Sequence, residues 1–284
     1  GRRRPRHQAP VSALTRARVW KVDTSGRPRR RIDAEAAVIG CSDAILASSE
    51  AEANQIRTLY GAAPDRIEIV APGVDHAFFS PGDQAGARAA TGLGPGPVLL
   101  FVGRIQPLKG LDVAVRALAD LDRPGATLVV VGGPSGVDGD GELARVRALA
   151  DRLGVAEQIR WIEPQPHTLL STWYRAADVC LVPSRSESFG LVALEAAACG
   201  VPVVAAAVGG LRSIVQHGRT GFLVEGRDPA VFASYVDEIL DAPEVASSFS
   251  AAAADRAAGY TWSTTAARLR RLYGDVVARA PVAC

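Results

Sequence analysis

Apolar segments alternate with helical patterns along the chain after Val98, and this alternation constrains the fold more than any other feature. The apolar segments are short, continuous runs rich in Val, Leu and Ile. Such runs, separated by helices, are typical of a parallel sheet that is covered on both faces. The sequence therefore predicts an α/β fold, with strands at residues 98–103, 127–132, 159–163, 178–184, 201–206 and 221–224.

Helices are expected between and after these strands, at residues 108–121, 142–153, 167–177, 190–199, 229–240, 243–258 and 263–279. The part before Val98 holds fewer elements. We expect a strand at 43–47, a helix at 49–60 with Ser48 or Ser49 as N-cap and Gly61 as C-cap, and a strand at 66–70. The segment SPGDQAG, at 80–86, is rich in Pro and Gly and predicts a linker. The chain therefore divides into an incomplete domain at 1–80, a complete α/β domain at 81–242 and C-terminal helices at 243–284.

Composition excludes several other classes of protein. Of the 284 residues, 48% are hydrophobic, which is ample for a packed core and too much for a disordered chain. The sequence holds no uncharged apolar run of about 18 residues, as a membrane span needs. The first ten residues, GRRRPRHQAP, lack the apolar region of a secretory signal, and the four Cys form no CxxC pair. These features favour a cytoplasmic protein. Since the chain starts with Gly and contains no Met, we expect it to be a fragment of a longer protein.

Positive charge is concentrated at the N-terminus. Residues 1–31 hold ten Arg and one Lys against one Asp, a balance of +10, whereas the remaining 21 basic and 29 acidic residues give −8. A basic arm can attract nucleic acid or anionic lipid, and the alternative is the solvated end of a domain. No aromatic-rich nucleic-acid motif accompanies the charge, so we expect no nucleic-acid partner.

Two cations follow the strand at 98–103, in the loop GRIQPLKG. Parallel sheets bind ligands where their strands end, so Arg104 and Lys109 lie in the region where a ligand is expected. A guanidinium fork beside an ammonium suits a diphosphate, and the alternative is ordinary surface charge. The loop after the next strand, GGPSG, does not match the GxGxxG pattern of nicotinamide enzymes.

Two carboxylates lie in the segment PSRSESFGLVALEAAACG, where seven residues separate Glu187 from Glu195. Ser188 and Gly190 lie at a helix start, whose free amides suit a phosphate or sugar oxygen. Glu195 is the only charge of an otherwise apolar helix that should be buried. A buried carboxylate is costly unless it is paired, so its partner is either an internal Arg or a ligand rich in hydroxyls.

The segments GRIQPLKG, GGPSG, YRAADVCLVPS and ESFGLVALEAAACGVPVVAA, in this order and spacing, resemble the retaining glycosyltransferases of family 4. The resemblance covers about residues 34–280, whereas the basic segment 1–31 does not match the family well. It implies the GT-B fold, in which two Rossmann-like domains close over the donor. The donor half would be the complete domain, and the N-terminal Rossmann-like domain, which supplies most of the acceptor site, would be incomplete. The helices at 243–284 would cross back to that first domain.

The resemblance also implies roles for individual residues. Arg104 and Lys109 would hold the donor diphosphate and stabilise the leaving UDP, and Glu187 would bind hydroxyls of the donor sugar; these three would be catalytic. Glu195 would accept hydrogen bonds from the ribose diol, and Gln165 would lie beside the base. The implied donor-binding set is completed by Gly103, Ser188, Phe189, Gly190 and Leu191.

Within the family, the chain most resembles the enzymes of mycothiol biosynthesis that transfer GlcNAc from UDP-GlcNAc to an inositol phosphate. This implies a nucleotide-sugar donor, a small hydroxylated acceptor and no obligatory metal. Relatives carry a peripheral Mg²⁺ near positions matching Tyr174, Arg175 and Ala177, but a further position there, usually Thr, is Val201 here. The resemblance leaves open another donor, such as GDP-mannose or UDP-glucose, a nucleotide-sugar-binding fragment without activity, and a homodimer.

Overall fold

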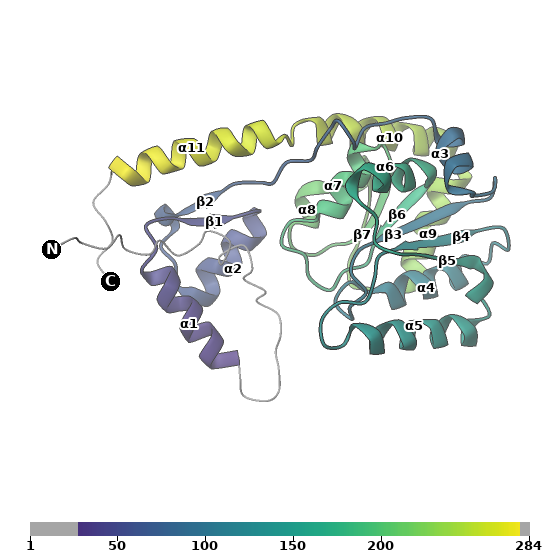
Figure 1. The fold of residues 1–284 in the computed structure, drawn as a ribbon, viewed down its shortest axis with the longest axis horizontal. Helices are drawn as coiled ribbons and strands as arrows, with labels where there is room; N and C mark the ends of the chain where they lie inside the picture. The colour runs from purple at the N-terminus through teal and green to yellow at the C-terminus, as the bar shows by residue number, and fades with distance from the viewer. Residues whose placement is uncertain (1–27, 279–284) are drawn as a thin grey trace. The chain divides into compact units, whose positions relative to one another are not determined.

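The computed structural model describes residues 28–278 and divides into two compact units (Figure 1). Unit 1 comprises Gly1–Ala71 and Thr265–Cys284, and unit 2 comprises Pro72–Thr264. The basic segment 1–27 lies outside the described residues. Within residues 28–278, no helix is both long and apolar enough to cross a membrane.

A single parallel sheet forms the centre of unit 2, as the alternating pattern predicts (Figure 1). Its six strands lie in the order β5-β4-β3-β6-β7-β8, and every neighbouring pair is parallel. The chain runs from β3 outward to β5, then returns and continues from β6 to β8. The order therefore reverses between β3 and β6, which is where open α/β sheets bind ligands. The strands are β3 (Val98–Val102), β4 (Thr127–Val131), β5 (Ile159–Ile162), β6 (Val179–Val182), β7 (Val203–Ala206) and β8 (Gly221–Val224).

Helices cover both faces of this sheet (Figure 1). On one face, α4 packs against α5 and α9; on the other, α6 packs against α3 and α7, and α7 against α10. The first group comprises α4 (Leu111–Asp120), α5 (Gly139–Leu153) and α9 (Pro229–Asp241). The second comprises α3 (Gln84–Thr91), α6 (His167–Ala176), α7 (Leu191–Ala198) and α10 (Pro243–Ala258). Short elements complete the unit: η3 (Ala156–Gln158) and α8 (Leu211–Ile214).

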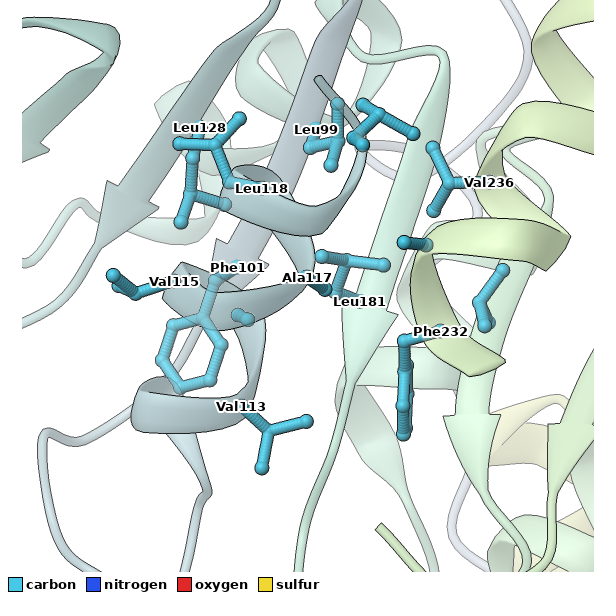
Figure 2. Packing of buried hydrophobic residues seen from close by; sticks show 14 of the residues in the cluster. Leu99, Phe101, Val113, Val115, Ala117, Leu118, Leu128, Leu181, Phe232 and Val236 are labelled. Atoms are coloured by element: carbon cyan, nitrogen blue, oxygen red, sulfur yellow. The ribbon is translucent and has the colours of Figure 1, made fainter. Parts of the chain in front are cut away.

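The main core lies between the sheet and the first group of helices, and Phe249 of α10, which also packs against α9, belongs to it as well. Figure 2 shows Leu118 of α4 with Leu128 of β4, and Phe232 of α9 with Leu181 of β6; all are buried. Because β3, β4, β6 and β7 are packed between helices, almost all their residues are buried, which explains their continuous apolar sequences.

One expected linker is a helix. The segment 80–86 was predicted to be a linker, but α3 begins within it. The Asp83 side chain accepts a hydrogen bond from the amide of Ala85 at 3.0 Å and so caps the helix. Arg88 then anchors α3 to the strand region, with its guanidinium 2.6 Å from Asp178.

Unit 1 contains a two-stranded parallel sheet, β1 (Ile45–Ala47) with β2 (Ile67–Ile69), and the helices α1 (Pro28–Gly40) and α2 (Glu50–Tyr60). Ser49 and Gly61 cap α2, as predicted. A 3-10 turn, η2 (Pro64–Arg66), precedes β2. Helix α11 (Trp262–Ala278) enters unit 1 at Thr265, whose hydroxyl donates to the Ala71 carbonyl at 2.8 Å.

The boundaries between the two units fall at 71/72 and 264/265, whereas the sequence predicts domain boundaries at 80/81 and 242/243. The C-terminal boundary differs because of α10, which the sequence analysis places among the helices that cross back to the first domain. Its Phe249 is buried in the main core of unit 2, and the helix packs against α7 and α9. Among these helices, only α11 supplies residues to unit 1 within the described part of the chain.

Candidate active site

Two loops meet where the strand order reverses. The loop after β3 carries Lys109, and the loop after β6 carries Glu187. They are joined by the backbone, because the amide of Arg185 donates to the Leu108 carbonyl at 2.8 Å. Gly110 has φ +73, and a Cβ there would overlap the Pro183 carbonyl, so this close approach requires glycine. The two loops are therefore held in a fixed pairing.

Lys109 and Glu187 form an ion pair at this point. The Lys109 Nζ lies 2.6 Å from Glu187 Oε2, although Glu187 comes 78 positions later in the chain. Their side chains are 18% and 19% exposed, and the hydroxyl of Ser184 lies 3.4 Å from the same carboxylate oxygen. An ammonium has three donors and a carboxylate about four acceptor sites, so both can contact a ligand without separating. The pair can thus offer a positive charge to an anion and an acceptor to a hydroxyl.

Two glycines support the loop that carries Glu187, and sequence reasoning missed them. The amide of Gly210 donates to the Glu187 carbonyl at 2.9 Å. At Gly209, where φ is +48, a Cβ would overlap that same carbonyl oxygen. The signal that could have revealed them is a Gly-Gly pair shortly after β7, at the edge of the sheet where ligands are expected.

A cavity of about 510 Å³ lies over the ends of β3, β4 and β5. Three residues predicted from the sequence line it: Gly103, Arg104 and Gln165. The loops after β3 and β4 are joined beneath it, because the amide of Ile105 donates to the Gly133 carbonyl at 2.8 Å. The remaining lining residues are Val102, Val131, Gly132, Gly133, Pro134, Ser135, Pro164, His167 and Leu170.

His167 belongs to this lining, and sequence reasoning did not select it. It is the first residue of α6 and is exposed. Its ring packs edge-on against Phe79, with the centroids 5.7 Å apart, and Phe79 also packs against Tyr174 of the same helix. His167 and Tyr174 therefore lie on one side of α6.

Glu195 has an internal partner, but not the arginine that was one alternative. The Tyr174 hydroxyl donates to its Oε2 at 2.8 Å. Burial raises the pKa of the Glu195 carboxyl, while the hydrogen bond from Tyr174 and the nearby His167 act in the opposite direction. Burial, and then the charge of Glu195, hold the pKa of Tyr174 well above its usual value. Glu195 is thus a carboxylate with one neutral hydroxyl donor.

The start of α7 carries the other predicted donor-binding residues. Ser188 and Leu191 are exposed, whereas Phe189 is buried, with its ring centroid 5.9 Å from that of Tyr260. Gly190 precedes the helix, and its carbonyl accepts from the amide of Leu194. The first amides of a helix have no partner within the helix, so they are suited to bind an anion or a sugar oxygen. Their contact with a donor stays a prediction.

The residues expected near a peripheral Mg²⁺ already have protein partners. Tyr174 donates its hydroxyl to Glu195, and the Ala177 carbonyl accepts from the Gln84 side chain at 3.0 Å. Arg175, a cation, donates to the carbonyls of Phe78 and Ser80 at 2.6 and 2.8 Å. Mg²⁺ prefers several oxygen ligands, and a neighbouring guanidinium opposes it. The Tyr174 and Arg175 side chains therefore do not supply ligands for Mg²⁺, and the peripheral Mg²⁺ stays a prediction.

Known proteins share these sequence and structural features. The sequence model of the family described as glycosyl transferases group 1 matches residues 67–256. The sequence model of glycosyltransferase family 4 matches residues 6–78. The second match begins inside the basic segment 1–31, so the expectation that this segment does not match the family well is wrong.

Two curated relatives are D-inositol 3-phosphate glycosyltransferases. That of Frankia alni is 49% identical over 263 residues, which are 90% of this chain and 64% of the relative. D-inositol 3-phosphate glycosyltransferase 2 of Catenulispora acidiphila is 48% identical over 253 residues, which are 87% of this chain and 59% of the relative. The chain thus spans about 60% of the length of these relatives.

A solved structure supports the fold over most of the chain. Sucrose-phosphate synthase from Thermosynechococcus elongatus superposes with a TM-score of 0.84 and 30% identity, covering 95% of this chain and 67% of the synthase. The parallel Rossmann-like sheet is therefore that of the GT-B fold, as the resemblance implied. With its fold, its strand-end loops and the match over residues 67–256, the chain belongs to the group 1 family of glycosyl transferases.

Proposed function

We propose that unit 2 binds a nucleotide-sugar donor at the strand ends, and that the chain serves the retaining transfer of GlcNAc from UDP-GlcNAc to an inositol phosphate. The observation that carries this proposal is the Lys109–Glu187 pair at the point where the strand order reverses. The names of the relatives, which are 48% and 49% identical, support the choice of acceptor.

The chemistry follows from the charges at the site. In the transfer, the bond between the sugar's anomeric carbon and the diphosphate breaks, and negative charge develops on the leaving UDP. Lys109 supplies positive charge beside Glu187, and Arg104 supplies it from the cavity after β3. Cations placed where charge develops lower the barrier, which is the role proposed for both residues. The acceptor hydroxyl attacks from the face that the diphosphate leaves and gives its proton to an oxygen of the leaving diphosphate, so the sugar keeps its configuration.

Glu187, Glu195 and Gln165 give the proposed site its selectivity. Glu187 accepts hydrogen bonds from hydroxyls of the donor sugar while it keeps its ion pair with Lys109. Glu195 accepts from the ribose diol, and Gln165, in the lining of the cavity, lies beside the base. The cytoplasmic location and the homodimer stay predictions, as does the absence of a nucleic-acid partner.

Calorimetric titration of the 284-residue chain with UDP-GlcNAc, UDP-glucose, GDP-mannose and ADP-glucose tests the proposal. We expect UDP-GlcNAc to bind most tightly. Preference for another sugar nucleotide would reassign the donor within the same family, and failure to bind any of the four would overturn the proposal. A parallel assay measures glycosylated inositol phosphate. Binding without product would favour the alternative of a binding module without activity.

A further inference from the structure

We infer that Tyr174 is a positioning residue of the donor site: its hydroxyl holds one oxygen of the Glu195 carboxylate, and so aims the other at the two hydroxyls of the donor's ribose. The inference rests on the proposed function, because it assumes that a nucleotide occupies the strand ends. It adds a residue that acts through Glu195 and touches no substrate.

Tyr174 is placed to hold another side chain in position. It lies in α6, is fully buried, and is the largest of the fully buried side chains in the described part of the chain. Its ring packs edge-on against Phe79, with the centroids 5.9 Å apart. A ring packed in this way has little rotational freedom, so the hydroxyl at its end is a fixed donor.

Glu195 needs such a donor. It is the only charged residue of α7, whose other residues are Leu, Val and Ala. Across residues 28–278, the Tyr174 hydroxyl is the one hydrogen-bond donor that reaches this carboxylate, at 2.8 Å. A carboxylate has about four acceptor sites, so most of its capacity is left for a ligand. Glu195 is half-buried, and a poorly paired carboxylate that is partly removed from water is costly, so a ligand that brings further donors is favoured.

The Tyr174–Glu195 contact lies on the side of α6 that lines the cavity. His167 and Leu170, which both line the cavity, precede Tyr174 by seven and four positions on α6 and so share its helix face, and Phe79 packs against both His167 and Tyr174. A vicinal diol carries two hydroxyl donors that one carboxylate can accept together. The ribose of a nucleoside diphosphate is such a diol, whatever its base. Without the Tyr174 hydroxyl, the carboxylate would lose its only fixed donor and could turn away from the diol.

Pairs of nucleotides that differ in one hydroxyl test this role. We would measure by calorimetry the affinities of UDP, GDP and ADP and of their 2′-deoxy forms. The variants are Tyr174→Phe, which keeps the ring but removes the hydroxyl, and Glu195→Asp, which keeps the charge but is too short to reach the Tyr174 hydroxyl. The control, Tyr235→Phe, removes a hydroxyl from a ring that stacks on Phe222 in the same unit.

For the nucleotide that wild type binds best, we expect the ribose form to bind more tightly than the 2′-deoxy form. Tyr174→Phe should weaken the ribose form about 10-fold, as expected for a lost hydrogen bond to a charged group, and should change the 2′-deoxy form much less. Glu195→Asp should remove the same preference, and Tyr235→Phe should leave it unchanged. If Tyr174→Phe is too unstable for calorimetry, the rise in its melting temperature with the ribose and 2′-deoxy nucleotides measures the same preference.

Contrary outcomes separate the two proposals. If wild type binds both forms equally, or if Tyr174→Phe weakens both forms by the same factor, the inference is wrong and the proposed function stands. If wild type binds none of the six nucleotides, the proposed function fails, and the inference fails with it.

Discussion

Lys109 is held by a carboxylate and faces the point where a ligand is expected, so its removal has a specific effect. We predict that Lys109→Ala weakens binding of UDP by about 1.5–3 kcal/mol, because a hydrogen bond between charged groups is lost. Binding of uridine, which lacks the diphosphate, should change little. Calorimetric titration of both ligands measures the difference.

A cation at the other end of the unit provides the control. Arg123 follows α4 and pairs with Asp237 and Asp241, each at 2.6 Å. It follows the C-terminal end of α4, whereas Lys109 precedes the N-terminal end, so Arg123 lies away from the strand ends. Arg123→Ala should leave the affinity for UDP unchanged. If Lys109→Ala weakened uridine as much as UDP, the assignment of Lys109 to the diphosphate would be wrong.

For single residues, the sequence predicts the location of those that directly follow a strand, because the end of the strand fixes where they lie. Arg104, Lys109 and Glu187 lie just after predicted strands, so their edge of the sheet could be foreseen. Tyr174 could not be foreseen as a partner of Glu195. A tyrosine on the buried face of a helix is typical of a core residue, and its hydroxyl meets a carboxylate 21 residues further on only through the packing of α6 against α7.

Among the elements, the long and strongly patterned ones were predictable and α3 was not. The strand at 221–224 and the helix at 243–258 have the bounds that the sequence suggested. Helix α3 begins inside a segment rich in Pro and Gly, which hides it in the sequence. It is stabilised by packing against α6 and by the Arg88 guanidinium, which contacts Asp178, 90 residues away, and such distant contacts leave no local pattern.

The contact between the loops after β6 and β7 gives a prediction about elements. Gly209→Ala would place a Cβ on the Glu187 carbonyl, so the loop that carries Glu187 must shift. We expect lower stability and a loss of UDP binding. Gly218→Ala is a matched control, since Gly218 also has positive φ, at +72, but has no atom within 4 Å of an added Cβ.

Chemical denaturation and calorimetry measure the two effects. Gly218→Ala should cost only about 1–2 kcal/mol of unfolding free energy, the strain of a left-handed residue, and should bind UDP normally. Gly209→Ala should cost more and should also lose affinity. Equal losses of stability in the two variants, with UDP binding intact in both, would show that the loop does not depend on Gly209.

For the whole molecule, the alternation of strands and helices predicts the parallel sheet of unit 2 because its central strands are covered on both faces. It does not predict which unit a later helix joins. Helix α10 was grouped with the crossing helices, but Phe249 packs into the main core of unit 2. The sequence of an amphipathic helix shows that one of its faces is apolar, but not which part of the protein that face packs against.

Unit 2 has its own core, and all the residues proposed to hold the donor lie within Pro72–Thr264. A unit with these properties should fold alone. We predict that residues 72–264, expressed alone, unfold in one cooperative transition and bind UDP within about 3-fold of the affinity of the 284-residue chain, since the ion pair and the cavity are unchanged. Thermal unfolding and calorimetry test both expectations. A cooperative fold with much weaker binding would mean that residues of unit 1 contact the nucleotide, whereas a non-cooperative transition would mean that this core is insufficient.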